Sequence, residues 1–268
     1  MAFVEVDVAP RFRAAKRKPV QRRPLLSIVV PTWNGGNRLS ATLAHLADFR
    51  GGLDHPTEIV IVDDCSEHST ARIAATFSHD NELTAVLTNA KNQGKGHAVA
   101  RGMLHANGDY RIFVDSDLAY PSCQISKLLV ALENGSDVAI ACRVLPESRY
   151  VMSPTFFHYL YTRHLLSRLF NRVAQRVLLP GILDSQAGLK GFTAQAAQTI
   201  FSRQTLSGFG FDLECLFIAR LHGLSIEQVP VDFYYGDEPS TISFVRHGAE
   251  MLTDLVRVRR NGARGIYA

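Results

Sequence analysis

Short apolar runs alternate with amphipathic stretches through the first half of the chain. The apolar runs, rich in β-branched residues, lie at 25–30, 58–64, 84–89, 110–115 and 137–143. Between them, at 37–47, 68–77, 95–106 and 122–133, apolar residues recur at helical spacing. Strands that are apolar on both sides and alternate with helices indicate a parallel sheet covered on both faces. We therefore expect an α/β, Rossmann-like fold with a mostly parallel sheet.

Polar residues directly follow four of these predicted strands. The sequence there reads PTWNGG at 31–36, DDCS at 63–66, NAKNQGKG at 89–96 and DSD at 115–117. Turn formation favours Gly, Asn and Asp in any single loop. Because ligands bind at the carboxyl ends of parallel strands, four such loops together predict a binding site.

The pair Asp115 and Asp117 places two carboxylates just past a buried strand. Their repulsion and burial are unfavourable, and a divalent cation removes that cost. Two carboxylates suit Mg²⁺ or Mn²⁺ completed by water and phosphate oxygens better than they suit Ca²⁺. The alternative is that Asp117 caps the following helix.

The segment NQGKG at 92–96 opens a predicted helix. Its amide groups favour an anion, its glycines allow close approach, and Lys95 adds positive charge. The spacing is not that of a P-loop, and no GxGxxG follows the first strand. The sequence thus predicts a nucleotide-diphosphate site with a metal, and it lacks the fingerprints of a kinase-like NTPase and of a dinucleotide dehydrogenase.

Composition sets the remaining limits. The chain has 268 residues, 46% hydrophobic and 20% charged, which is ordinary for a globular protein with one large domain. Its net charge of +4 originates in residues 1–24, where we expect a disordered basic arm. The arm lacks interleaved aromatic residues, so we do not expect nucleic-acid binding. The four cysteines are scattered, which favours free thiols in a reducing compartment over disulfides or a zinc site.

Taken in order, the motifs resemble those of the family 2 glycosyltransferases, which have the GT-A fold. The resemblance rests on PTWN (31–34), VDDCS (62–66), NQGKGHAVARGM (92–103) and DSD (115–117). DSQAGLKGF (184–192) and GFDLE (210–214) are similar to segments of the dolichyl- and polyprenyl-phosphate sugar transferases, most of all the glucosyltransferase branch. The resemblance covers about residues 25–260. It implies a GT-A domain at 25–235 and inverting transfer of a hexose from a nucleotide-sugar, with UDP-glucose favoured, to a polyprenyl phosphate.

The resemblance also implies residue roles. Donor binding would fall to Pro31, Thr32, Trp33, Asn34, Asp63, Asp64, Lys95, Asp115, Ser116 and Gln186. Asp115 and Asp117 would hold Mg²⁺ or Mn²⁺, and the catalytic candidates are Arg143, Asp184 and Asp212. Arg143 would position phosphate, whereas an aspartate base would be needed only for a hydroxyl acceptor, because a phosphate monoester is already mostly dianionic at neutral pH.

Three features depart from the family pattern. Gly35 replaces an acidic residue, His68 replaces the last acid of the DDxSxD motif, and Ala119 stands where the mannosyl branch has a glutamine. Two alternatives therefore stay open. One is a metal-dependent glycosyltransferase with a soluble or glycan hydroxyl acceptor, and the other is a non-catalytic nucleotide-sugar-binding protein.

No run of about 18 apolar residues predicts a membrane span. Residues 154–179 instead predict an interface-type amphipathic helix, and 236–268 predict a second amphipathic helix. An apolar row at Leu165, Leu169, Val173 and Val177 runs beside a basic row at His164, Arg168, Arg172 and Arg176. We expect a cytoplasmic protein attached peripherally to an anionic membrane surface. Packing of the first helix on the sheet edge or at a dimer contact is the alternative, and the oligomeric state is left open.

Overall fold

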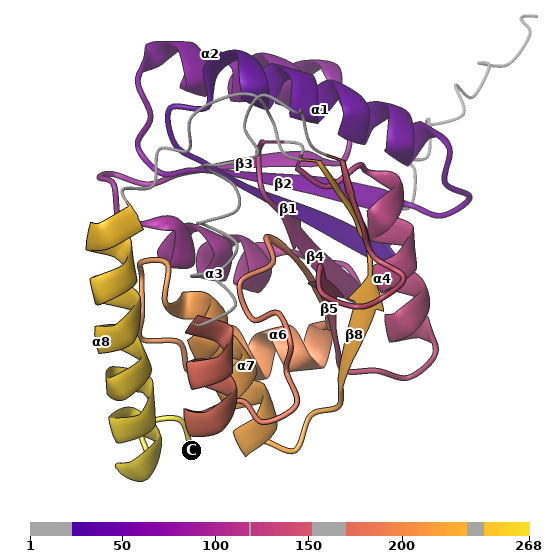
Figure 1. Cartoon of the computed structure of the whole chain (residues 1–268). Coiled ribbons are helices and arrows are strands. Elements are labelled where there is room, and N and C mark those ends of the chain that lie inside the picture. Colours follow the sequence, from indigo (N-terminus) through magenta and orange to yellow (C-terminus); the bar gives the residue numbers. More distant parts are fainter. Residues whose placement is uncertain (1–22, 118, 152–169, 235–243) are drawn as a thin grey trace, which may run out of the picture.

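The computed structural model describes residues 23–117, 119–151, 170–234 and 244–268 (Figure 1). The arm predicted at 1–24 therefore lies outside the described residues except for its last two. Arg23 lies 3.4 Å from the Asp109 carboxylate and donates a hydrogen bond to the carbonyl of Asn107. The end of the arm thus contacts the domain.

Seven strands form one mixed sheet in the order β3-β2-β1-β4-β7-β5-β8. Within the described part of the chain, β7 alone runs antiparallel to its sheet neighbours. The strands are β1 (Leu26–Thr32), β2 (Thr57–Asp63), β3 (Thr84–Thr88), β4 (Tyr110–Val114), β5 (Val138–Cys142), β7 (Leu189–Thr193) and β8 (Ile226–Pro230). Two short strands, β6 (Arg149–Val151) and β9 (Asp232–Tyr234), pair with each other beside the sheet.

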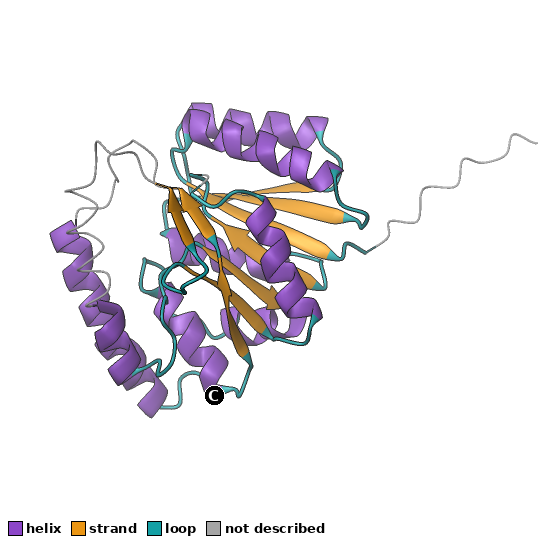
Figure 2. Cartoon of the chain, turned by 45° about the vertical axis from the view of Figure 1, so that its right-hand side comes forward, coloured by secondary structure: helices purple, strands orange, loops and turns teal. Residues whose placement is uncertain are grey.

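Helices cover both faces of the sheet, as Figures 1 and 2 show. One face carries α1 (Gly36–Gly51), α2 (His68–Asp80) and α4 (Cys123–Glu133). The other carries α3 (Lys95–His105), α6 (Ala194–Phe201) and α7 (Phe211–Leu221), with α8 (Phe244–Ala263) packed outside α7.

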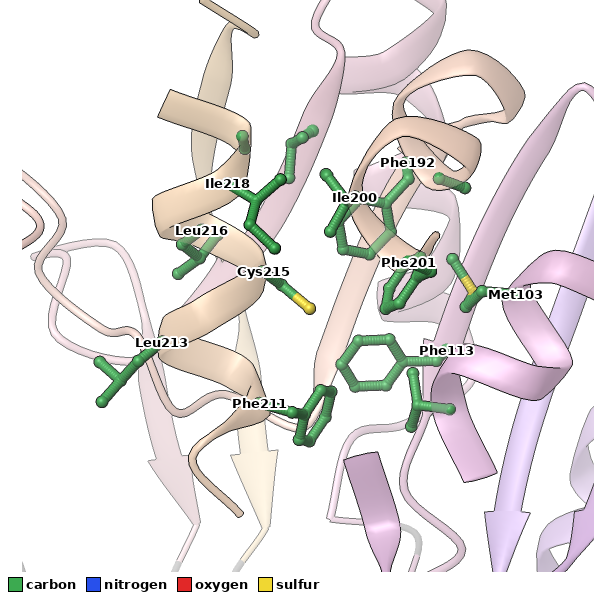
Figure 3. Packing of buried hydrophobic residues seen from close by; sticks show 14 of the residues in the cluster. Met103, Phe113, Phe192, Ile200, Phe201, Phe211, Leu213, Cys215, Leu216 and Ile218 are labelled. Carbon is green, nitrogen blue, oxygen red and sulfur yellow. The ribbon is translucent and has the colours of Figure 1, made fainter. Parts of the chain in front are cut away.

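Alternate residues of the central strands enter the two cores. Ile28 and Val30 of β1 pack under α1 and α4, whereas Val29 packs toward α3. Figure 3 shows the core under α3, α6 and α7, where Phe113 of β4 packs against Phe192 and Phe211. The centroid of the Phe113 ring lies 6.4 Å from that of Phe192 and 5.8 Å from that of Phe211. Burial on both faces explains why these strands read as continuous apolar runs.

The five predicted strands each lie within two residues of those observed, which confirms the α/β prediction. Strand β1 continues through Pro31 to Thr32, although we expected Pro31 to end it. Pro31 lies beyond the last pair that β1 makes with β4, at Val29, so on that side no ladder bond requires its missing amide.

The predicted interface helix is only partly within the described residues, because 152–169 lie outside them. Residues 170–177 are helical. Here Phe170, Val173 and Val177 pack against the core between α3, α6 and α7. The described end of the expected membrane-facing row is therefore half-buried against the core, which supports the packing alternative at this end.

Candidate active site

The site residues meet at one edge of the sheet. Thr32 of β1 pairs with Asp63 of β2, and Asp63 pairs with Thr88 of β3, so the carboxyl ends of these strands are level. Arg143 follows β5 at the same edge. Since β7 runs the opposite way, the segment before it also arrives there, and Gly188 accepts a hydrogen bond from the Asp115 amide at 3.0 Å.

Two buried polar groups lie near the ends of β1 and β2. Asp63 is 1% exposed, and its Oδ1 accepts a hydrogen bond from the Ser66 amide at 3.1 Å. Its Oδ2 and the Thr32 hydroxyl have no hydrogen-bond partner among the described residues. Buried polar atoms are nearly always paired, so this pair of atoms marks a place for a ligand.

The loop after β1 is held by the loop after β2. Asn34 adopts a positive φ of 50°, its amide donates to the Ser66 hydroxyl, and its side-chain oxygen accepts from the Glu67 amide, both at 2.8 Å. The neighbouring Trp33 remains 58% exposed. An exposed indole on a fixed loop is available to stack on a flat ligand.

Asp64 differs from Asp63, although the sequence could not separate them. Its carboxylate accepts hydrogen bonds from the Asn89 side chain at 2.6 Å and from the Gln93 and Gly94 amides at 3.0 and 2.7 Å. The sequence predicted that amides of the 92–96 loop bind an anion. For the Gln93 and Gly94 amides, that anion is the Asp64 carboxylate of the protein itself. This carboxylate holds the loop in place, and Asp63 is the one with an available oxygen.

The glycines of the same loop also have a different purpose from the one predicted. A Cβ on Gly94, whose φ is +97°, would lie 2.5 Å from the Ser207 carbonyl oxygen. One on Gly96 would lie 2.9 Å from the Leu206 and Gly208 carbonyl oxygens. The close approach that requires glycine is therefore between the start of α3 and the 206–208 loop.

Lys95 reaches across to the DSD turn. Its Nζ lies 2.7 and 2.9 Å from the two carboxylate oxygens of Asp115. Burial opposes the charge of Lys95, but the carboxylates of Asp115, Asp212 and Asp117 outweigh it and raise the lysine pKa. Lys95 is thus held as a cation beside the acidic pair.

Asp117 does not cap α4, because Ser122 occupies the N-cap position. Its Oδ1 instead accepts a hydrogen bond from the Ala119 amide at 3.0 Å, and the residue is exposed. Desolvation by neighbouring protein atoms, together with the charge of Asp115, raises the Asp117 pKa. The Ser116 carbonyl, which accepts from the Thr42 hydroxyl at 3.0 Å, anchors the turn to α1.

Two neighbouring carboxylates, one of them exposed, make this turn a fit for a partly hydrated divalent cation. Within the described residues no group of three or more His, Cys, Asp or Glu side chains surrounds a common point, so a cation here needs ligand oxygens as well. Gly188 is required beside it, because any Cβ at 188 would overlap the Asp115 carboxylate.

Arg143 and Asp184 form a closed ion pair. The guanidinium donates to both Asp184 oxygens at 2.7 and 2.8 Å, and the Arg143 amide adds a third hydrogen bond at 3.0 Å. Burial alone would raise the Asp184 pKa, but Arg143 reverses this and lowers it. The guanidinium also lies 5.3 Å from the ring centroid of Phe233.

Asp212 is buried against Lys190, a residue that the sequence did not single out as functional. Lys190 is 0% exposed and contacts both the Asp212 carboxylate and the Ala187 carbonyl. Burial raises the Asp212 pKa, while Lys190 and Lys95 work against that rise. The neighbouring Glu214 is used internally, by Thr205, Leu206 and Tyr267.

Two further polar side-chain atoms are buried without a hydrogen-bond partner in the described part of the chain. Gln186 Nε2 has no hydrogen-bond partner in the described ranges, in keeping with its predicted contact to a ligand. The same holds for the hydroxyl of Tyr120, which the sequence did not indicate. Its only sequence signal was an aromatic residue three positions after Asp117.

These residues lie at the carboxyl-end edge of an α/β sheet, and comparison with known proteins identifies the family. The model of glycosyl transferase family 2 matches residues 27–201, and the chain belongs to this family of glycosyltransferases. Relatives include the dolichyl-phosphate β-glucosyltransferase of Dictyostelium discoideum, 29% identical over 251 residues, which are 90% of this chain and 76% of that protein.

A second relative transfers a different sugar. The dolichol-phosphate mannosyltransferase of Pyrococcus furiosus is 30% identical over 208 residues, covering 78% of this chain and 56% of that protein. Among solved structures, glucosyl-3-phosphoglycerate synthase from Mycobacterium tuberculosis, crystallised with Mn²⁺, UDP-glucose and phosphoglyceric acid, matches with a TM-score of 0.64. It is 17% identical, and the match covers 88% of this chain and 80% of that one. The GT-A fold is thereby confirmed.

Proposed function

We propose that this protein transfers a hexose, with inversion, from UDP-glucose to a polyprenyl phosphate. The dolichyl-phosphate glucosyltransferase relatives support the reaction class. Support from the site itself comes from the state of its acidic residues. Near the donor edge, Asp63 keeps an unpartnered oxygen within the described residues and Asp117 is exposed, while Asp115 is paired with Lys95. On the acceptor side, Asp184 and Asp212 are both held in ion pairs.

On the donor side, Thr32 and Asp63 would bind the nucleoside through their unpartnered oxygens, and Trp33 would stack on the base. Asp115 and Asp117 would hold Mg²⁺ or Mn²⁺, which when bound neutralises charge on the departing diphosphate. Lys95, kept protonated beside Asp115, would add its own positive charge next to that diphosphate.

On the acceptor side, neither predicted aspartate is well placed as a base. Asp184 accepts three hydrogen bonds from Arg143 and has a lowered pKa. Asp212 is buried and paired with Lys190. A hydroxyl acceptor needs a base, but a phosphate monoester, with a second pKa near ~6, does not. This observation favours the phosphate acceptor over the soluble or glycan hydroxyl acceptor.

Approach to a lipid substrate would use the outer face of α8. Leu252 and Val256 are 51% and 63% exposed on this helix, and Arg257 and Arg260 are exposed beside them. Exposed apolar side chains next to arginines suit an anionic bilayer surface. A cavity of about 610 Å³ lies between this helix and the 205–209 loop, which also contacts the start of α3.

Among the helices of the described ranges, none combines the length and the hydropathy of a membrane span.

The decisive experiment incubates the protein with labelled UDP-glucose, Mg²⁺ and vesicles containing a polyprenyl phosphate. Label should enter the lipid fraction with release of UDP, and the matched non-phosphorylated polyprenol should accept none. EDTA should abolish transfer. Equal transfer to the polyprenol would refute the phosphate-acceptor assignment, and tight binding without UDP release would favour the non-catalytic alternative. Parallel assays with GDP-mannose test the choice of sugar.

Membrane attachment has its own assay. The protein should sediment with vesicles containing phosphatidylserine and not with neutral phosphatidylcholine vesicles. The double substitution Arg257→Gln and Arg260→Gln should weaken binding to the anionic vesicles about 30-fold, because each arginine near an anionic surface contributes ~1 kcal/mol. Unchanged sedimentation would place the membrane contact elsewhere on the chain.

A further inference from the structure

Tyr120 is a buried tyrosine whose hydroxyl has nothing to bond to within the described ranges. It is 3% exposed and lies between the DSD turn and α4. Its chain position is fixed on both sides. The Ala119 amide donates to Asp117, and the Ala119 carbonyl accepts from the Tyr234 amide of β9 at 2.9 Å. The Gln124 side chain ties the start of α4 to Asp232 of the same strand.

The ring of Tyr120 is packed as firmly as its backbone. It meets Phe233 edge to face, with centroids 4.9 Å apart and an interplanar angle of 66°. The same Phe233 carries the Arg143 guanidinium 5.3 Å from its centroid. Phe233 thus contacts both the Tyr120 ring and the Arg143 guanidinium of the Arg143–Asp184 pair. This shared contact holds the phenol ring beside the acceptor side of the site.

The surroundings of the hydroxyl keep it protonated. Burial raises the Tyr120 pKa well above its usual value, and the carboxylates of Asp184, Asp115 and Asp117 add to this rise, while Arg143 opposes it. The hydroxyl therefore stays protonated at neutral pH. It is a neutral group that donates one hydrogen bond and accepts others.

The ligand group that matches this hydroxyl follows from its position. During transfer, the hexose lies between the departing diphosphate and the attacking acceptor oxygen. Lysine and arginine serve the anions at the two ends. Tyr120, which follows the DSD turn and shares Phe233 with Arg143, offers a neutral phenol that matches a neutral sugar hydroxyl better than it matches phosphate. A buried donor without a partner is unfavourable until a ligand satisfies it.

We propose that the Tyr120 hydroxyl hydrogen-bonds to a hydroxyl group of the hexose being transferred and so helps to select the sugar. This inference rests on the proposed function, because it assumes a nucleotide-sugar donor at the DSD turn. It adds a specificity residue that neither the motifs nor the ion pairs indicated.

The test measures the affinity of the whole protein for UDP-glucose and for UDP, with Mg²⁺, by calorimetry. Tyr120→Phe removes one oxygen atom and should weaken UDP-glucose binding roughly three- to tenfold, the range for one neutral hydrogen bond, while UDP binding stays unchanged. Tyr110→Phe, at the opposite end of β4, is the matched control and should change neither affinity.

A series of 2-, 3-, 4- and 6-deoxy UDP-glucose analogues identifies the partner. One analogue should bind wild type and Tyr120→Phe equally, because it lacks the hydroxyl that Tyr120 contacts. Its loss relative to UDP-glucose should equal the loss caused by the substitution. The unliganded variant should melt no lower than wild type, because no protein hydrogen bond is removed.

Four outcomes would overturn the Tyr120 assignment. These are wild-type affinity of Tyr120→Phe for UDP-glucose, an equal loss of UDP affinity, deoxy penalties that all persist in the variant, or a large drop in melting temperature. If the variant weakens UDP-glucose binding selectively but no label reaches polyprenyl phosphate, the lipid acceptor is wrong and the Tyr120 inference stands. If wild type does not bind UDP-glucose at all, the proposed function and this inference both fail.

Discussion

The acidic residues on the two sides of the site differ in the partners that their carboxylates have. Near the end of β2, Asp63 keeps a buried oxygen without a hydrogen-bond partner in the described structure. Beyond β4, Asp117 is exposed, while Asp115 is paired with Lys95. Toward β5, β7 and α7, Asp184 and Asp212 are each held by a cation of the protein itself. Within the described residues, the first side therefore keeps carboxylates outside ion pairs, whereas both carboxylates of the second side are paired.

On the proposed function, this difference separates carboxylates that would bind ligands from carboxylates that would position other groups, a distinction that a motif alone does not make. A buried carboxylate with an available oxygen is stabilised only when something binds it. One that accepts several hydrogen bonds contributes mainly to the fold and to the orientation of its partner. The following substitutions test this division, starting with the largest expected effect.

Asp212→Asn should lower the free energy of unfolding by about 3–5 kcal/mol, because it leaves the buried Lys190 cation uncompensated. Chemical denaturation measures this loss. The double variant Asp212→Leu, Lys190→Met should recover most of it, and Asp109→Asn, which breaks an exposed pair with Arg23, should change stability little. Wild-type stability of Asp212→Asn would contradict the assignment of Asp212 to the fold.

Asp117→Asn should lower kcat for hexose transfer about 10²- to 10³-fold, the scale of losing one group that stabilises developing charge. Its melting temperature should not change, because the side chain is exposed. Asp80→Asn, at the far end of α2, serves as the control. Retention of full activity at saturating Mg²⁺ would remove Asp117 from the donor side of the comparison.

Asp184→Asn should lower the free energy of unfolding at neutral pH by about 2 kcal/mol, because it weakens charge-assisted hydrogen bonds to Arg143. The folded-state pKa of Asp184 is lowered, so its stabilisation is present above the unfolded pKa near ~4 and is lost as pH falls below it. Denaturation curves from pH 7 to 3 should therefore converge for wild type and variant. A constant gap across this range would disprove the ion-pair account.

Trp33→Ala should raise the KM for UDP-glucose about fivefold with little change in kcat, because one stacking contact to a base is worth about 1 kcal/mol. Trp33→Phe should retain most of the affinity. Initial-rate kinetics measure both. An effect on kcat alone would indicate that the indole acts on the reacting groups and not on the nucleotide.

The first half of the fold was predictable because each strand and the turn after it can be recognised from a short stretch of sequence. Strands β1, β2 and β4 are buried on both faces, so their sequences read as apolar runs, and the polar turns that follow them read as ligand loops. The family assignment rested on these loops and is confirmed.

Strand β7 could not be read in the same way. Its sequence, LKGFT, contains a lysine and a glycine, and it becomes a strand because β4 and β5 lie on either side of it. Lys190 is tolerated there only because Asp212, 22 residues away, neutralises it. No periodicity in the chain signals such a contact.

The sequence by itself determined the α/β architecture, the edge of the sheet at which the candidate site lies, and the acidic and basic residues gathered there. These follow from apolar periodicity and from the chain order of strands and turns. Only the tertiary structure decided which carboxylates remain available. It showed that Asp64 holds the protein's own loop, that Asp184 and Asp212 are paired, and that the Tyr120 hydroxyl is unpartnered in the described structure. The physical reason is that the state of a polar group depends on its neighbours in space, and here those neighbours come from distant parts of the chain.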